Sequence, residues 1–147
     1  MDKIYHEFLS TEISTEDAGL IVEKVKSHSW YVQQLSHFVW SATRKAVTVE
    51  IVDKAFSQIV NTNLPLYVAE CEALSITQLN LLIAIAKGES ILTGATTMSK
   101  YKLGTPQNVS KNKIVLEQKD ILDKTVEGFY FLDPVFEFWF KSEYVDG

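Results

Sequence analysis

The chain has 147 residues, of which 46% are hydrophobic and 22% are charged, and its formal net charge is -5. This length can bury one good core or two small ones. Charged and histidine residues interrupt the richest apolar stretch, so no run reaches the roughly 18 apolar residues of a membrane span. The segment Met1–Glu7 lacks the apolar centre of an export signal, and the single cysteine, Cys71, excludes an internal disulfide and a cysteine metal cluster. We therefore expect a cytoplasmic protein.

Apolar residues at helical spacing predict two helices at the start of the chain. The first runs from Thr15 to about Ser27 and is capped by Ser14. The second runs from about Trp30 to Lys45, and its apolar residues recur every three or four positions. Together they indicate a small helical bundle.

A third helix is predicted from Val49 to Asn61, with Thr48 as its cap. We expect the segment Asn61-Thr62-Asn63 to end it, because these side chains compete for backbone hydrogen bonds. Pro65 is tolerated in the first turn of a helix and so predicts a short fourth helix that ends near Glu72.

The second half begins with a helix from Ile76 to Lys87, capped by Ser75 and ended by Gly88. A short helix from about Thr97 to Tyr101 follows and leads into the tight turn Leu103-Gly104-Thr105. Two helices joined by such a turn are typical of a helix-turn-helix unit.

Thr105 is the expected cap of the next helix, and Pro106 fills its first position, with an end at about Gln118. Its apolar residues are predicted in the core: Val109, Ile114, Val115 and Leu116. Its polar residues are predicted on the outside: Gln107, Asn108, Ser110, Lys111 and Lys113.

The chain then predicts a hairpin, in which residues 121–124 pair with residues 129–132. Asp133 caps a last helix that carries four closely spaced aromatic residues: Phe136, Phe138, Trp139 and Phe140. No single helix face buries all four. We expect them to be enclosed between the two halves of the chain, the alternative being that some of them await a partner.

This order of elements predicts a mainly α fold with two domains. Residues 1–73 form a helical, lid-like bundle, and residues 74–147 form a winged helix-turn-helix with a small β-hairpin wing. The expected junction lies near Ala73 to Ser75.

The motifs of common enzyme sites are missing from the sequence. It has no Gly-x-x-x-x-Gly-Lys-Ser/Thr loop for nucleotide phosphates and no Gly-x-Ser-x-Gly turn for a serine nucleophile. His28 and His37 are nine residues apart, which is not a metal-ligand spacing on one helix face. We expect no catalytic activity, no metal and no cofactor in this chain.

One basic segment stands out in an acidic chain. Between residues 100 and 119 a single acid, Glu117, is accompanied by five lysines: Lys100, Lys102, Lys111, Lys113 and Lys119. Lysines neutralise phosphates and polar helix residues read bases, which suits DNA binding by Gln107, Asn108, Lys111 and Lys113. The wing, residues 123–128, contains two acids and one lysine, and this opposes DNA binding. Contact with a protein or with another domain through the same four residues is the favoured hypothesis.

Four segments resemble the C-terminal region of the archaeal-type P-loop ATPases, which are related to the AAA+ and STAND NTPases. The segment from Val25 to Trp40 resembles their lid. Residues 74–89 are similar to the start of the winged helix that follows it, and residues 101–105 and 131–140 to its later landmarks. Relatives often carry Gly-x-Pro where this chain has Ser27-His28-Ser29-Trp30.

The resemblance implies that the chain corresponds to the C-terminal part of a longer ATPase, whose core binds ATP and Mg²⁺ upstream of Met1. The lid surface nearest the nucleotide would then hold Trp30, Tyr31 and Gln34. The leading hypothesis is a non-catalytic regulatory region that couples nucleotide state to a protein or DNA partner. The alternative is a stand-alone, DNA-binding transcriptional regulator. A lid separated from its core would expose apolar surface and favour a homodimer of the fragment.

Overall fold

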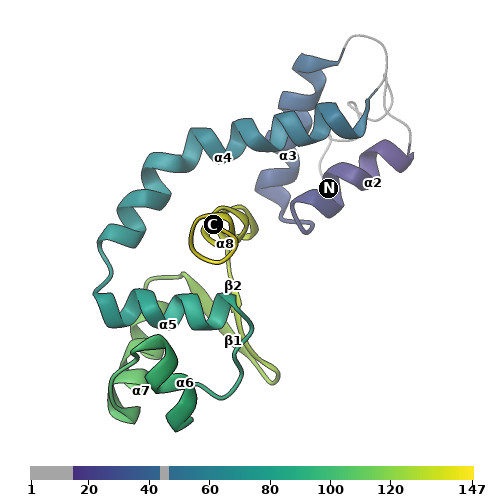
Figure 1. The fold of residues 1–147 in the computed structure, drawn as a ribbon. Helices are drawn as coiled ribbons and strands as arrows, with labels where there is room; N and C mark the ends of the chain where they lie inside the picture. The colour runs from purple at the N-terminus through teal and green to yellow at the C-terminus, as the bar shows by residue number, and fades with distance from the viewer. Residues whose placement is uncertain (1–14, 44–46) are drawn as a thin grey trace. The chain divides into compact units, whose positions relative to one another are not determined.

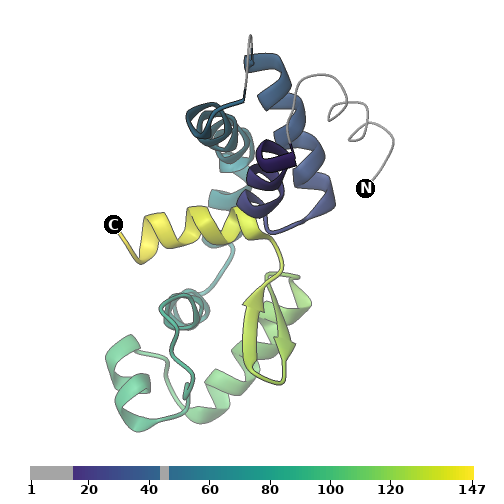
Figure 2. The ribbon, with the colours of Figure 1, turned by 90° about the vertical axis from the view of Figure 1, so that its right-hand side faces the viewer.

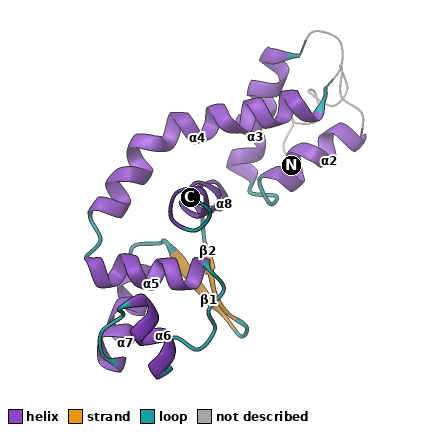
Figure 3. Cartoon of the chain, viewed as in Figure 1, coloured by secondary structure: helices purple, strands orange, loops and turns teal. Residues whose placement is uncertain are grey.

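The computed structural model describes residues 15–43 and 47–147. These residues are mainly helical and include one sheet of two strands, as Figure 3 shows, and the predicted fold class is confirmed. The chain divides into two compact units between Leu64 and Pro65. This division lies earlier in the sequence than the junction expected near Ala73.

The first unit contains α2 (Thr15–Lys24), α3 (Ser29–Ala42) and the first part of α4 (Val49–Glu72), as labelled in Figure 1. The Lys24 ammonium pairs with Asp53 at 3.1 Å and lies 4.9 Å from the centroid of the Phe56 ring, which ties α2 to α4. The predicted cap Ser14 and the predicted helix end at Lys45 lie outside the described residues. The core of this unit is mainly aliphatic and includes Ile21, Val25, Val32, Leu35, Val39, Ala55 and Ile59, together with the rings of Tyr31 and Phe56.

Helix α2 ends at Lys24 rather than at Ser27, because the backbone turns left-handed immediately after it. Lys26 has a φ of 52° and Ser27 a φ of 60°. The Ser27 amide donates to the Val22 carbonyl at 2.8 Å, a bond that closes the end of the helix. Both residues carry a Cβ, which disfavours this conformation.

We expect Ser27→Gly to stabilise the first unit by about 1 kcal/mol. Glycine removes the left-handed penalty of a Cβ, and this gain exceeds the added chain entropy of the unfolded state. Urea denaturation followed by circular dichroism measures the change. The matched control is Ser57→Gly on the exposed side of α4, where glycine should lower stability by about 0.5 to 1 kcal/mol. A loss of stability in both variants would contradict the assigned backbone at Ser27.

Helix α4 is continuous from Val49 to Glu72, so the predicted break at Asn61-Thr62-Asn63 is wrong. The Thr62 hydroxyl donates to the Gln58 carbonyl at 2.7 Å, and the side-chain amide of Asn63 donates from Nδ2 to the Ile59 carbonyl at 2.8 Å. These polar side chains therefore bond to carbonyls of their own helix one turn back instead of ending it.

The second unit contains a helix-turn-helix and a hairpin. The hairpin lies beside α7, as Figure 2 shows, and helix α5 contacts α6, α7 and α8. The two strands are antiparallel, with Leu122 opposite Phe131 and Thr125 opposite Gly128. The elements are α5 (Ile76–Ala86), α6 (Ala95–Tyr101), α7 (Pro106–Gln118), β1 (Leu122–Thr125), β2 (Gly128–Phe131) and α8 (Pro134–Tyr144).

The predicted helix caps of this unit are confirmed. Ser75 forms a capping box with Gln78 at the start of α5, and the Thr105 hydroxyl accepts the Asn108 amide at the start of α7. The Asp133 carboxylate accepts the amides of Val135 and Phe136 at 2.9 and 3.0 Å. Each cap satisfies amides that the first turn of a helix leaves without a partner.

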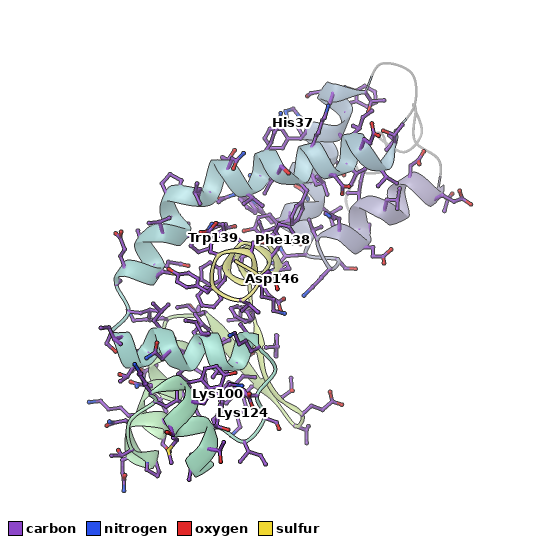
Figure 4. All side chains as sticks on the ribbon, viewed as in Figure 1. His37, Lys100, Lys124, Phe138, Trp139 and Asp146 are labelled. Atoms are coloured by element: carbon purple, nitrogen blue, oxygen red, sulfur yellow. The ribbon has the colours of Figure 1, made fainter. Side chains whose placement is uncertain are left out.

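Aromatic side chains form much of the core of the second unit. Phe140 is fully buried, and its ring lies 5.9 Å from that of Phe131 and 5.8 Å from that of Phe136. Tyr67, from the end of α4, packs against Phe136 and Trp139. Phe138, labelled beside Trp139 in Figure 4, is 48% exposed. Of the four closely spaced aromatic residues at positions 136–140, three are thus buried and one, Phe138, is not.

Candidate binding face of the winged helix

The turn between α6 and α7 depends on Gly104. Lys102 ends α6 with a left-handed φ of 56°, Leu103 is buried, and Gly104 has a φ of 86°. A Cβ on Gly104 would lie 2.6 Å from Nδ2 of Asn108. The turn therefore requires glycine, both for its backbone conformation and for the space that the Asn108 amide occupies.

The inner side of α7 is set by Val109, Asn112 and Leu116, which are all buried. They are three and four positions apart, and so share one face of the helix. Asn112 donates from Nδ2 to the Thr77 hydroxyl at 3.3 Å, and this bond ties α7 to the first turn of α5. Sequence reasoning missed Asn112, although its place on the stripe between the two apolar residues could have identified it.

Ile114, predicted in the core, is 56% exposed, and that prediction is wrong. With the inner stripe of α7 established, Ile114 falls on the outer side, in line with Gln107 and Lys111. All three side chains are exposed, as predicted for Gln107 and Lys111. The structure thus brings an amide, an ammonium group and an aliphatic side chain onto one face, which we call the α7 face.

The other two predicted residues of this helix have contacts within the domain. Asn108 is exposed, but its amide packs against the backbone of Gly104. Lys113 is half-buried, and its ammonium lies 5.7 Å from the centroid of the Phe129 ring on the hairpin. This distance is within the range of a cation–π contact, which links α7 to the wing. Gln107 and Lys111 are therefore better placed than Asn108 and Lys113 to meet a partner.

Two further lysines of the basic segment interact with acids of the same unit. Lys100, labelled in Figure 4, lies 3.7 Å from Glu89, which also accepts the hydroxyl of Tyr101 at 3.0 Å. Burial raises the pKa of Glu70, and the positive charge of Lys119 opposes that rise. In the part of the chain that the structure describes, no ion pair involves Lys111. Part of the basic segment is thus paired with acids of the same unit, whereas the ammonium of Lys111 lies exposed on the α7 face.

The wing presents acidic and apolar groups. The Tyr130 hydroxyl donates to the Asp123 carboxylate at 3.1 Å, a hydrogen bond that raises the pKa of Tyr130. Val126 at the tip is completely exposed, and so is most of Glu127 beside it. Lys124, labelled in Figure 4, is the only basic residue between Asp123 and Gly128. This surface would repel a phosphate backbone more than it would attract one.

The three predicted lid residues on α3 differ in exposure. Trp30 is 51% exposed and Gln34 is half-buried, whereas Tyr31 is only 4% exposed. The Tyr31 ring packs against those of His28 and Trp30, with centroid distances of 5.0 and 4.9 Å. The expectation that Tyr31 lies on the surface is wrong, because its side chain is buried. Contact of Trp30 and Gln34 with a nucleotide stays a prediction.

Cys71 is a core residue, as its sequence context indicated. Burial raises the pKa of its thiol to about 11, although a hydrogen bond with Tyr144 opposes that rise. A thiol with this pKa is almost entirely protonated near neutral pH and is a poor nucleophile.

The described residues contain no cluster of three or more histidine, cysteine or acidic side chains arranged to hold a metal ion. None of their helices combines the length and the apolar character that crossing a bilayer requires.

A family model described as a probable winged helix domain matches residues 65–142. The match extends from the last turns of α4 into α8 and includes the whole α7 face and the wing. No curated protein and no solved structure matches the chain.

Proposed function

We propose that this chain, which belongs to the family of probable winged helix domains, is the non-catalytic regulatory region of a P-loop ATPase. In this proposal the helical first unit acts as a lid and the winged helix carries the nucleotide state of an ATPase core to a partner in the cytoplasm. ATP and Mg²⁺ would be held by that core. The proposal is supported by the resemblance of residues 25–40 to an ATPase lid and of residues 74–89 to the start of the winged helix that follows it.

The composition and exposure of the α7 face are the features that most directly support binding of a partner by the winged helix. Gln107, Lys111 and Ile114 are aligned on one exposed side of α7, held there by the buried residues of the opposite side. In such a contact Ile114 would supply the apolar centre, and Gln107 and Lys111 would lie at the polar edge. The acidic wing and the exposed Val126 also favour a protein partner over a duplex.

DNA binding is the second candidate, and the composition of α7 favours it. Winged helices generally bind DNA, and Gln107 and Lys111 are residue types that contact bases and phosphates. Lys102 lies in the turn before α7 and adds another exposed positive charge.

A titration against labelled duplex DNA separates the two candidates. For a protein-binding module, we expect no salt-dependent binding at low ionic strength, because the wing is acidic. A DNA-binding module would bind, would lose affinity as salt rises, and would be weakened at least tenfold by Lys111→Glu. Lys54→Glu on α4 is the matched control, since it makes the same charge change outside the winged helix. Salt-dependent binding lost in Lys111→Glu but kept in Lys54→Glu would overturn the protein-binding assignment.

We also expect the purified chain to show no ATP turnover, since its sequence lacks a loop that cradles phosphates. A coupled assay with ATP and Mg²⁺ measures this. The ATPase relationship itself is tested by the coding sequence upstream of the Met1 codon. A Gly-x-x-x-x-Gly-Lys-Ser/Thr loop after a strand pattern in that reading frame would support it. An upstream frame without such a loop, or turnover by the chain alone, would contradict the proposal.

A further inference from the structure

Helix α4 belongs to both units and has no buried side chain where they divide. Its first part is anchored in the first unit by Phe56 and Ile59, and its last part in the second unit by Tyr67 and Cys71. Every side chain from Val60 to Leu66 is exposed or half-buried. Most helical stability in proteins comes from packing of a buried face, so this segment lacks the main source of its stability.

The backbone of the same segment is also weakly held. Pro65 has no amide hydrogen, so it cannot donate to the carbonyl of Asn61, and its ring disfavours a straight helix. The side chains of Thr62 and Asn63 donate to the carbonyls of Gln58 and Ile59. Such bonds to carbonyls one turn back bend helices and compete with the main-chain bonds.

The low helix propensity of this segment also indicates that its helical structure is weak. Val60, Asn61, Thr62 and Asn63 are consecutive residues of low helix propensity, and Pro65 is the least favourable residue in a helix interior. Within α4, the only proline therefore lies just after a run of weak helix formers. The division between the two units, between Leu64 and Pro65, lies one residue beyond that run.

We propose that residues 60–66 of α4 are a hinge. The main-chain hydrogen bonds of this segment break and reform, and this lets the two units change their relative orientation. This inference rests on the proposed function for its purpose, because a relay between a lid and a winged helix needs a point of movement. The hinge itself is defined by the missing amide of Pro65, the absence of buried side chains and the low helix propensity of the segment.

Hydrogen exchange of the whole chain, without nucleotide or DNA, tests the hinge directly. The amides of residues 61–64 should exchange at least tenfold faster than those of residues 52–59 and 67–72. Pro65→Ala restores the missing donor and should slow exchange in the segment at least tenfold. Leu66→Ala, at the neighbouring exposed position, is the control and should change the exchange rate of residues 61–64 less than twofold.

Spin labels at Ser57→Cys and Ser142→Cys, in a Cys71→Ala background, report the movement between the units. Their distance distribution should be broad and should narrow on Pro65→Ala. Exchange of residues 61–64 as slow as that of the flanking segments would overturn the hinge, and so would a distribution that Pro65→Ala leaves unchanged. These results are independent of DNA binding and of the upstream sequence, so a failed hinge is distinguishable from a failed proposed function.

Discussion

Phe140→Ala is expected to lower the free energy of unfolding of the second unit by about 3 to 5 kcal/mol, the usual cost of removing a fully buried phenyl ring. Phe140 is 0% exposed, and its ring stacks on Tyr144 with a centroid distance of 4.6 Å. It also contacts Phe131 on the hairpin and Phe136 on its own helix. The cavity would therefore disrupt the packing of α8 against strand β2 of the hairpin. A loss of this size is a large fraction of the stability of a small domain.

The control for this variant lies two positions away on the same helix. Phe138 is 48% exposed, so Phe138→Ala should change stability by less than about 1 kcal/mol. Urea denaturation followed by tryptophan fluorescence and circular dichroism measures both variants. Equal losses at the two positions would contradict the orientation of α8, because they would place both rings in the core.

Gly104→Ala should lower stability by about 2 to 3 kcal/mol, since the left-handed backbone alone costs a residue with a Cβ roughly 1 to 2 kcal/mol. The rest of the loss comes from the new methyl group, which would lie 2.6 Å from Nδ2 of Asn108. The Asn108 side chain must move, and with it the first turn of α7. We expect thermal and urea unfolding to show the loss, and any binding through the α7 face to weaken.

Two comparisons isolate the contact with Asn108. Gly88 has nearly the same φ, 87°, but an added Cβ would meet nothing within 4 Å. Gly88→Ala should therefore cost only the backbone term of about 1 to 2 kcal/mol. Gly104→Ala should lower the free energy of unfolding more than Gly88→Ala does. The double variant Gly104→Ala/Asn108→Ala should remove that difference, because it lacks the side-chain amide that the new methyl group displaces. If Gly104→Ala costs no more than Gly88→Ala, the close packing of the turn is wrong.

Lys111 and Lys113 have different surroundings on α7, so variants at the two positions report on different properties. Lys113 covers the Phe129 ring, so its removal affects the contact between helix and wing as well as the charge. Lys111 is exposed, and changing it alters the α7 face with less effect on packing. For this reason Lys111 is the informative position for binding, and Lys113 is the informative position for the fit of the wing.

Local signals in the sequence were sufficient for the caps, the turn and the hairpin. Ser75, Thr105 and Asp133 cap the helices they were predicted to cap, because an N-cap acts on amides two or three residues away. Gly104 and Gly88 take the positive φ values that only glycine adopts at little cost. Such short-range effects require no knowledge of the rest of the fold.

Features that depend on contacts between residues distant in sequence were not predicted correctly. Asn61-Thr62-Asn63 carried the local pattern of a helix end, yet α4 continues through it with anchors on both sides. Ile114 was assigned to the core from its apolar character, whereas Asn112 occupies the buried position because it finds a partner in Thr77. Tyr31 was assigned to the surface and is enclosed by its neighbours.

The sequence by itself therefore determined the class of fold, the residues that begin most of the helices, and the order of the elements except for the two predicted helices that are joined in α4. Only the tertiary structure decided which side of α7 faces outward, which lysines are engaged by neighbouring groups and where the chain divides into units. The physical reason is the separation in sequence of the residues that interact. Capping and turn formation depend on residues close in sequence, whereas burial depends on which distant side chains meet, and that is defined only when the chain is folded.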